Sequence, residues 1–434
     1  MQYAIKPMYT DTIAAIATPP GEGGIGTIRL SGPDAGRILG RLFVAASGKR
    51  LDAASMESHK LVYGAVVDPK SGERVDEALV VLMRGPHSYT AEDVVEFDCH
   101  GGVVPLQSVL ALCLREGARA AEPGEFTLRA FLNGRIDLAQ AEAVLDVVKA
   151  RTGEGLRLAV EQLGGGLSAR VKGIRAKLLH ALAHLEALID FPEDDVPPAD
   201  VSPDLEEALE DLRALIASAN TGIVLRQGVK TAIVGRPNVG KSSLLNALLR
   251  VDRAIVTDIP GTTRDTLEEV ANVGGVPLVL TDTAGLRSGD DTEDPIERIG
   301  MDRTRRVLEN ADLAVLVVDG SEMLTAEDIA IIEEIKALEP PAWLVVINKF
   351  DLPKKLNARS LLQVIGKTPF VPASAKRKNG TRELEEKLAA LVLGGKVVPR
   401  PGEAVVTSVR HRDALVRAEE SVGSALRAAR AGMV

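Results

Sequence analysis

The stretch Gly235-Arg-Pro-Asn-Val-Gly240-Lys241-Ser242-Ser243 decides the fold of the central part of this 434-residue chain. Its spacing, G-x-x-x-x-G-K-S, is that of a phosphate-binding loop. An apolar run, Lys230-Thr-Ala-Ile-Val, precedes it, and Leu244-Leu-Asn-Ala-Leu-Leu follows with helical spacing, which predicts a strand, a loop and a helix. Backbone N–H groups of such a loop surround phosphate oxygens, and the helix points its positive end at them. We expect Lys241 to reach the outer phosphates and Ser242 to ligate Mg²⁺.

Three further motifs follow in order, each after an apolar run that predicts a strand. Asp282-Thr-Ala-Gly285 suits the magnesium ion and the outermost phosphate, and Ser374-Ala-Lys376 suits a loop over the guanine carbonyl. In Asn348-Lys-Phe-Asp351, the carboxylate can accept two hydrogen bonds from guanine donors that adenine lacks. The four motifs together predict a GTP-hydrolysing domain. The expected nucleotide contacts are Asn238, Val239, Gly240, Lys241, Ser242, Ser243, Thr257, Thr263, Asp282, Thr283, Ala284, Gly285, Asn348, Lys349, Asp351, Ser374, Ala375 and Lys376.

The residues expected to drive hydrolysis are unusual. Leu286 stands where Ras-like enzymes carry a glutamine that orients water, and leucine cannot hydrogen-bond water. The chain is therefore either a slow, switch-like GTPase or one with a different catalytic device. Asn238 inside the phosphate loop and the carbonyl-rich loop Thr257–Asp265 are the residues available for such a device, with Thr263 as the expected switch threonine on Mg²⁺.

This set resembles the potassium-activated GTPases, and in particular the MnmE (TrmE) family of tRNA-modification GTPases. The resemblance implies a K⁺ ion lying against the phosphates in place of an arginine finger, where its charge would stabilise the charge that grows there. The implied K⁺ ligands are Asn238, Thr257, Ile259 and Thr262. The resemblance also implies that Glu297 orients the attacking water. The residues alone leave Glu293 and Asp294 open as alternatives.

The N-terminal region contains G-x-G-x-x-G at Gly21, Gly23 and Gly26, which would suit a dinucleotide-binding loop. Such a loop opens a helix. Here the glycines precede Thr27-Ile-Arg-Leu, which predicts a strand. We therefore reject dinucleotide binding for this region.

Other segments resemble the same family: Tyr89–Gly102, Pro123–Glu142 and Ile189–Asp195. The resemblance implies that the N-terminal domain mediates dimerisation and binds formyl-tetrahydrofolate as a one-carbon donor. The matching positions are Arg29, Glu96 and Arg135. The family often has lysine in place of Arg135, and the planar guanidinium does not copy an ammonium. Without the resemblance, each of the three reads as a surface salt-bridge residue.

The partners implied by the resemblance are tRNA and an MnmG-type FAD protein. The chain itself is expected to form a homodimer, which can join the FAD protein in a heterotetramer. The reaction implied is a carboxymethylaminomethyl-type addition to the wobble uridine. Two alternatives stay open: a ribosome-assembly GTPase switch, and a paralogue that keeps GTPase activity without modification. The second arises because the family ends in Cys-x-Gly-Lys, whereas this chain ends Ala431-Gly-Met-Val434, which predicts a shortened closing region.

Composition predicts a cytoplasmic protein of two to three domains. Two cysteines argue against a disulfide framework, the first residues lack a secretory pattern, and no apolar run has membrane-spanning length. Lys and Arg total 52 against 61 Asp and Glu, a net charge of −9. A protein of this charge needs a local basic patch for any contact with tRNA.

Pattern breaks predict the domain organisation. We expect an α+β domain over residues 1–133, a first helical part over 134–228, a GTPase domain with a doubly wound sheet over 229–393, and a second helical part over 394–434. The GTPase domain is thus inserted into a helical domain whose two pieces pack together. Within the first helical part, Leu178, Leu179, Leu182 and Leu185 share one helix face.

Overall fold

The computed structural model describes residues 10–190, 200–251, 269–280, 305–377 and 379–431. The chain divides into two compact units, an N-terminal unit up to Val144 and a C-terminal unit from Leu145 onward. The boundary falls within α4 (Leu138–Val148). Within the described ranges, none of the helices combines the length and the apolar character needed to cross a membrane.

The N-terminal unit is built on a seven-stranded sheet with the order β3-β4-β5-β6-β2-β1-β7. Neighbouring strands pair antiparallel except for β1 and β7, which are parallel. The strands are β1 (Ile13–Ile16), β2 (Gly23–Ser31), β3 (Phe43–Ala45), β4 (Val62–Val67), β5 (Arg74–Met83), β6 (Val94–Gly101) and β7 (Arg119–Ala120).

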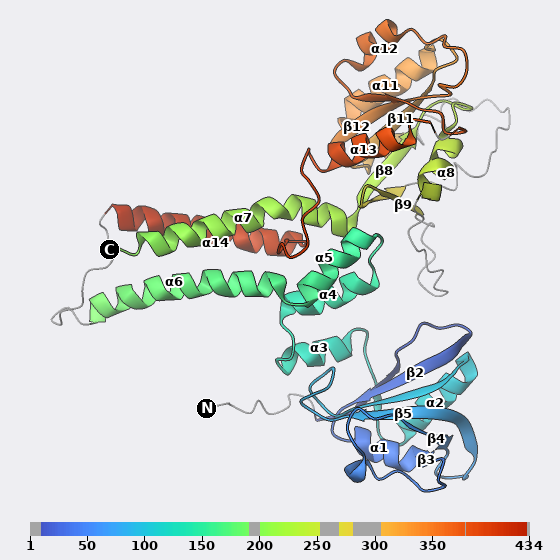
Figure 1. Cartoon of the computed structure of the whole chain (residues 1–434), viewed down its shortest axis with the longest axis vertical. Helices are drawn as coiled ribbons and strands as arrows, with labels where there is room; N and C mark the ends of the chain where they lie inside the picture. The colour runs from blue at the N-terminus through green and yellow to red at the C-terminus, as the bar shows by residue number, and fades with distance from the viewer. Residues whose placement is uncertain (1–9, 191–199, 252–268, 281–304, 378, 432–434) are drawn as a thin grey trace. The chain divides into compact units, whose positions relative to one another are not determined.

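Two helices pack on this sheet and close its core (Figure 1). The helices α1 (Ala35–Leu42) and α2 (Val103–Arg115) contribute Ile38 and Val109, which are fully buried against strand residues such as Phe97. A short helix, α3 (Glu125–Leu132), follows β7. Gly26 lies within β2, where a Cβ would stand 2.5 Å from a methyl carbon of Leu106 on α2, so a larger residue would have to displace this buried leucine. The strand predicted at Thr27–Leu30 is thus confirmed, and it begins earlier than predicted, so that Gly23 and Gly26 lie within it.

The C-terminal unit contains a six-stranded sheet with the order β13-β12-β11-β8-β10-β9. All neighbours are parallel except β9, which runs antiparallel to β10 at one edge. The strands are β8 (Val229–Val234), β9 (Glu269–Val273), β10 (Val276–Leu280), β11 (Leu313–Asp319), β12 (Ala342–Asn348) and β13 (Phe370–Pro372).

Helices cover both faces of this sheet, as predicted for a doubly wound fold. Alternate residues of β11 face opposite ways: Val315 packs with α8 and α13, whereas Leu316 packs with α11 and α12. The four helices are α8 (Lys241–Val251), α11 (Ala326–Leu338), α12 (Ala358–Ile365) and α13 (Thr381–Val392).

The remaining helices that the structure describes in the C-terminal unit flank the sheet region in sequence. They are α5 (Gly153–Leu163), α6 (Gly166–Asp190), α7 (Ser202–Gln227) and α14 (Val409–Arg430). The helices α7 and α14 lie side by side (Figure 1), joined by ion pairs such as Arg213–Glu419 at 2.8 Å. Since β8 begins directly after α7 and α14 follows α13, the expected insertion of the sheet region between two packed helical pieces is confirmed.

The apolar face predicted for α6 is only partly covered. The buried side chains are Leu167, Ile174 and Ala181, which repeat every seven residues, whereas Leu179 and Leu182 are 44% and 48% exposed. The sequence places several apolar residues around this helix, and its spacing does not say which of them the neighbouring helix covers.

Candidate functional site

The phosphate-binding loop connects β8 to α8, as the sequence predicts. Two glycines shape it. Gly235 has φ +149°, and a Cβ there would stand 2.4 Å from the carbonyl oxygen of Val317 on β11. Gly240 has φ +96°, and its Cβ would stand 2.2 Å from the Nδ2 atom of Asn348. Any side chain at either position would therefore displace a neighbouring element as well as strain the backbone.

The lysine of the loop lies close to the loop's own backbone. The Nζ atom of Lys241 donates to the carbonyl oxygens of Gly235 and Arg236, both at 2.8 Å. Asn238 is exposed and takes a positive φ of 64°, so its backbone adopts a left-handed conformation. Ser242 and Ser243 are exposed in the first turn of α8. An ammonium, an amide and two hydroxyls thus lie at or next to the N-terminus of a helix, which favours anions.

Asn348 joins three of the four predicted motifs. It ends β12 and is 3% exposed. Its Nδ2 donates to the carbonyl oxygen of Val239 at 2.8 Å, and its Oδ1 accepts from the backbone N–H of Ala375 at 3.1 Å. The phosphate loop and the Ser374-Ala-Lys376 loop are therefore held to the same side chain.

Asp351 lies beside this junction with its charge stabilised. Its Oδ1 accepts from the Oγ of Ser374 at 2.6 Å, and its Oδ2 lies 3.4 Å from the Nε of Arg377. The hydrogen bond from Ser374 lowers the pKa of Asp351, and the positive charge of Arg377 acts in the same direction. An ionised carboxylate accepts hydrogen bonds and donates none, so this group suits a ligand edge with two N–H donors.

Three ion pairs at the carboxyl ends of these strands escaped the sequence analysis. Lys349, which has a positive φ of 57°, pairs with Asp319 at the end of β11 (Nζ to Oδ2, 2.7 Å). Arg236 of the phosphate loop pairs with Glu322, and its Nε lies 3.3 Å from the Oδ2 of Asp328. One signal could have revealed Asp319: it is an acid at the end of an apolar run, the same pattern that marked Asp282.

Several predicted site residues lie outside the described residues. They are Thr257, Ile259, Thr262, Thr263, Asp282, Thr283, Ala284, Gly285 and Glu297. The strand that leads to the Asp282 motif, β10, is described up to Leu280 and pairs in parallel with β8. Lys376 is described and exposed.

A second candidate site lies in the N-terminal unit around Arg29. Arg29 on β2 and Glu96 on β6 are directly opposite in the strand register, and their Nε and Oε1 atoms are 2.6 Å apart. The guanidinium of Arg29 lies 5.3 Å from the ring centre of Tyr89 and 5.7 Å from that of Phe126. The guanidinium of Arg135 lies 5.1 Å from the same Tyr89 ring. The structure thus brings the three predicted residues together around one aromatic ring.

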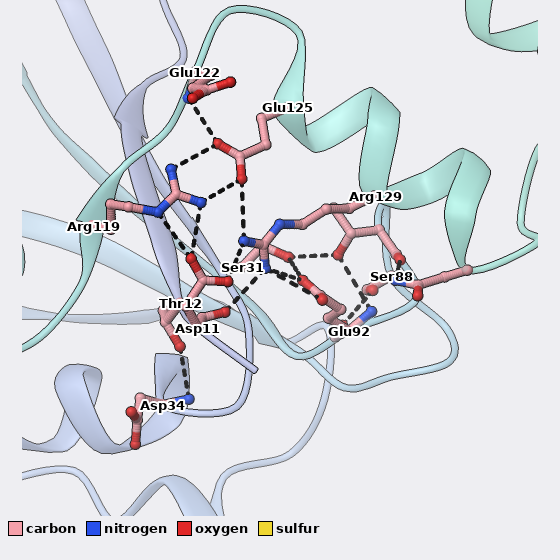
Figure 2. Close-up of polar contacts among 12 residues, drawn as sticks. Asp11, Thr12, Ser31, Asp34, Ser88, Glu92, Arg119, Glu122, Glu125 and Arg129 are labelled. Atoms are coloured by element: carbon pink, nitrogen blue, oxygen red, sulfur yellow. Dashed lines mark hydrogen bonds and ion pairs between the residues drawn. The ribbon is translucent and has the colours of Figure 1, made fainter. Parts of the chain in front are cut away.

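A network of charged side chains supports this arrangement (Figure 2). Arg129 on α3 is completely buried, and its guanidinium contacts Asp11, Glu92 and Glu125 at 2.8 to 3.2 Å. Arg119 binds Glu125 from the other side at 2.6 Å, and this hydrogen bond lowers the pKa of Glu125.

The network fastens α3 to the loop that carries Tyr89. Three contacts cross between them: Arg129 to Glu92, the Nδ2 of Asn133 to the carbonyl oxygen of Thr90 at 2.8 Å, and the hydroxyl of Tyr89 to that of Thr127 at 2.9 Å. Since Phe126 and Thr127 lie on α3, the buried charges fix the aromatic surroundings of Arg29. Sequence reasoning missed these three contacts because they join residues 37 to 43 positions apart.

The composition of the second site indicates its ligand chemistry. Two guanidiniums share the ring, and among the described residues the ion pairs supply only Glu96 as a carboxylate partner. The site is therefore net positive, with aromatic surface beside it. It suits an anionic ligand with a flat ring, and Glu96 can accept hydrogen bonds from ring N–H groups.

Comparison with known proteins covers nearly the whole chain. Residues 12–135 match the family described as the GTP-binding protein TrmE N-terminus, and residues 138–434 match the MnmE helical domain. Three relatives named tRNA modification GTPase MnmE are similar over most of their length. They come from Alkaliphilus oremlandii (49% identity, 95% of this chain, 88% of the relative), Heliobacterium modesticaldum (49%, 96% and 90%) and a Roseiflexus species (52%, 96% and 90%).

A solved structure of Era in complex with MgGDPNP and 16S ribosomal RNA is 29% identical over 38% of this chain and 56% of that chain. Its TM-score is 0.26, too low to support a conclusion.

Proposed function

This chain belongs to the MnmE family of tRNA modification GTPases, and on that premise we propose which residues bind GTP and which serve the modification of tRNA. It is a GTP-hydrolysing enzyme that acts in tRNA modification, as its relatives are. The main support for the nucleotide site is the pair of hydrogen bonds by which Asn348 holds both the phosphate loop and the Ser374 loop. In a parallel sheet, ligands bind at the carboxyl ends of the strands, where these loops lie.

The guanine base is bound by Asp351, with Lys349, Ser374, Ala375 and Lys376 around it. The support is the ionised carboxylate of Asp351, held by the Ser374 hydroxyl at 2.6 Å. Asp351→Asn replaces one acceptor with a donor, so the preference for GTP over xanthosine triphosphate should fall sharply. The measurement is kcat/KM for both nucleotides. An unchanged ratio would refute the role in base recognition.

The phosphates are bound by Lys241 and by the backbone N–H groups of residues 238–243. GTPases of this class use Mg²⁺, and we assign Ser242 and Thr263 as its ligands, with Asp282 to Gly285 near the outer phosphate. Bound Mg²⁺ neutralises charge on the phosphates. Ser242 fits this role, because it is an exposed residue in the first turn of α8, next to Lys241. We further propose that the loops of Thr262–Thr263 and Gly285 are ordered by the outer phosphate and released after hydrolysis.

Potassium is the proposed source of positive charge beside the phosphates, with Asn238, Thr257, Ile259 and Thr262 as its ligands. Asn238 supports this assignment because its side chain is exposed within the phosphate loop. Arg236, the arginine of the same loop, is paired with Glu322 and Asp328. Its charge is thus compensated on the protein. Bound K⁺ supplies electrostatic stabilisation, and Glu297 orients the attacking water in place of the glutamine that Leu286 replaces.

The Arg29 site is the proposed binding site for formyl-tetrahydrofolate, with Glu96 and Arg135. Its support is the net positive charge beside an aromatic surface. The glutamate carboxylates of the folate match the guanidiniums, and the ring N–H donors match Glu96. We propose that the chain acts as a homodimer, or in a heterotetramer with an MnmG-type FAD protein. The assembly adds a carboxymethylaminomethyl-type group to the wobble uridine of tRNA.

Equilibrium binding of formyl-tetrahydrofolate to the full chain tests the one-carbon site. Arg29→Ala and Glu96→Gln should each weaken binding by about tenfold or more, because each removes a charge-assisted contact. Arg74→Ala is the matched control, since Arg74 forms an exposed pair with Glu77 elsewhere on the same sheet. Absence of binding by the unaltered chain, or equal loss in the control, would contradict the assignment.

A further inference from the structure

Asp319 is an acidic residue that the nucleotide site described above does not use. It is the last residue of β11, and its side chain is 2% exposed. Its Oδ2 lies 2.7 Å from the Nζ of Lys349, and its Oδ1 accepts from both the N–H and the hydroxyl of Ser321, at 2.8 and 2.6 Å. Burial alone would raise the pKa of Asp319, but the hydrogen bonds from Lys349 and Ser321 outweigh it and lower the pKa. The group is thus a fixed, ionised carboxylate.

Backbone hydrogen bonds also hold the segment around Lys349 to the ends of the neighbouring strands. The N–H of Gly320 donates to the carbonyl oxygen of Asn348 at 2.9 Å, and the N–H of Phe350 donates to that of Ala373 at 3.1 Å. Between these two bonds, Lys349 adopts a left-handed conformation with φ 57°, which is unfavourable for a residue with a side chain. Its position is therefore set by its neighbours on both sides.

The side chain of Lys349, like its backbone, is held in place by a neighbouring residue. A lysine carries its charge on a flexible four-carbon stem, and an exposed lysine samples many rotamers. Lys349 is one-third exposed, yet its ammonium is held at the buried end of β11. The contact fixes the ammonium end of this side chain, two residues before Asp351 in the chain.

We propose that Asp319 is a positioning residue for guanine recognition, which holds Lys349 so that its methylene stem forms a fixed wall of the base site beside Asp351. This inference rests on the guanine site proposed above. Asp319 itself does not contact the nucleotide. Because it holds Lys349 in place before the base binds, the site loses less conformational entropy on binding. Its effect therefore falls on affinity and leaves the rate of the chemical step unchanged.

Asp319→Asn keeps the shape of the side chain and removes its charge. We expect the Kd for GTP and for GDP to rise about five- to twentyfold, with kcat at saturating GTP within about twofold of the original. Asp312→Asn is the matched control, because Asp312 is an exposed aspartate directly before the other end of β11. It should leave both Kd values unchanged.

A double-mutant cycle with Lys349→Met separates positioning from a general structural effect. If Asp319 acts through Lys349, the single variants lose similar affinity, and Asp319→Asn adds no further loss to Lys349→Met. Additive losses, or a lowered kcat at unchanged Kd, would overturn the proposal. Lys349→Met alone tests the contact if Asp319→Asn does not fold, since it removes the exposed partner; unchanged affinity in it would also overturn the proposal.

Failure of the role proposed for Asp319 can be distinguished from failure of the guanine site itself. If Asp351→Asn shifts preference toward xanthosine triphosphate while Asp319→Asn has no effect on Kd, only the role of Asp319 fails. If Asp351→Asn leaves the preference unchanged, the guanine site fails and the role of Asp319 fails with it.

Discussion

Gly240→Ala is the substitution that most sharply tests how the phosphate loop is built. The alanine Cβ would stand 2.2 Å from the Nδ2 of Asn348, at a backbone φ of +96°. Asn348 cannot yield freely, because it is 3% exposed and hydrogen-bonded to Val239 and Ala375. The methyl group must therefore break at least one contact that joins the motif loops.

The expected cost has two parts. A left-handed backbone conformation costs an alanine about 1–2 kcal/mol, and a buried amide left without its partner costs about 1–3 kcal/mol, so the total is about 2–5 kcal/mol. Gly394→Ala is the matched control: Gly394 has φ +60°, and no atom lies within 4 Å of its Cβ position. The control should therefore show only the first part.

The assay measures the free energy of unfolding by urea denaturation and the Kd for GTP by titration of a fluorescent analogue. Gly240→Ala should lower the free energy of unfolding by about 1–3 kcal/mol more than the control does. Its affinity for GTP should fall by about tenfold for every 1.4 kcal/mol by which the substitution destabilises the loop conformation that binds GTP. Equal effects of the two substitutions would refute the reasoning, because the collision with Asn348 would then cost nothing.

Three other predictions concern separate parts of the chain. Glu297→Ala should slow GTP hydrolysis in single-turnover assays while the Kd for GTP stays unchanged; lost affinity would point to a structural role. Arg129→Met leaves the carboxylate of Glu92 buried without its cationic partner and should lower the free energy of unfolding by about 3–5 kcal/mol, against about 0–1 kcal/mol for Arg382→Met in an exposed pair. Burial raises the pKa of Cys99 and of Cys113 to about 12, so both thiols stay neutral at pH 8. Alkylation at that pH should require denaturant, and rapid labelling of the native chain would contradict the burial.

The sequence predicted the parts of the fold that depend on local order. A strand, a glycine loop and a helix at Gly235–Ser243 follow from residues that are adjacent in the chain, and the structure has them there as β8, the loop and α8. The strand predicted at Thr27–Leu30 was also local, since it relied on an apolar run, and the structure extends that strand back to Gly23. The insertion of the sheet region between helical pieces followed from the change in hydrophobic period at Val229.

The contacts that complete each site could not be predicted in this way. Arg236 and Glu322 are 86 residues apart, and Arg129 and Asp11 are 118 apart. A charged side chain has many candidate partners in a chain with 26% charged residues, and only the folded backbone decides among them. For α6, spacing identified apolar residues but could not show that Ala181 is buried while Leu182 is exposed.

The central claim is that an alkali ion, bound in part by Asn238, supplies the positive charge that no arginine of the phosphate loop brings to GTP. The most direct test is the rate of GTP turnover at constant ionic strength with K⁺ or Na⁺, in the unaltered chain and in Asn238→Ala. The account predicts a rate higher by about tenfold or more in K⁺, and loss of that gain in Asn238→Ala. Equal rates in the two salts for the unaltered chain would contradict it.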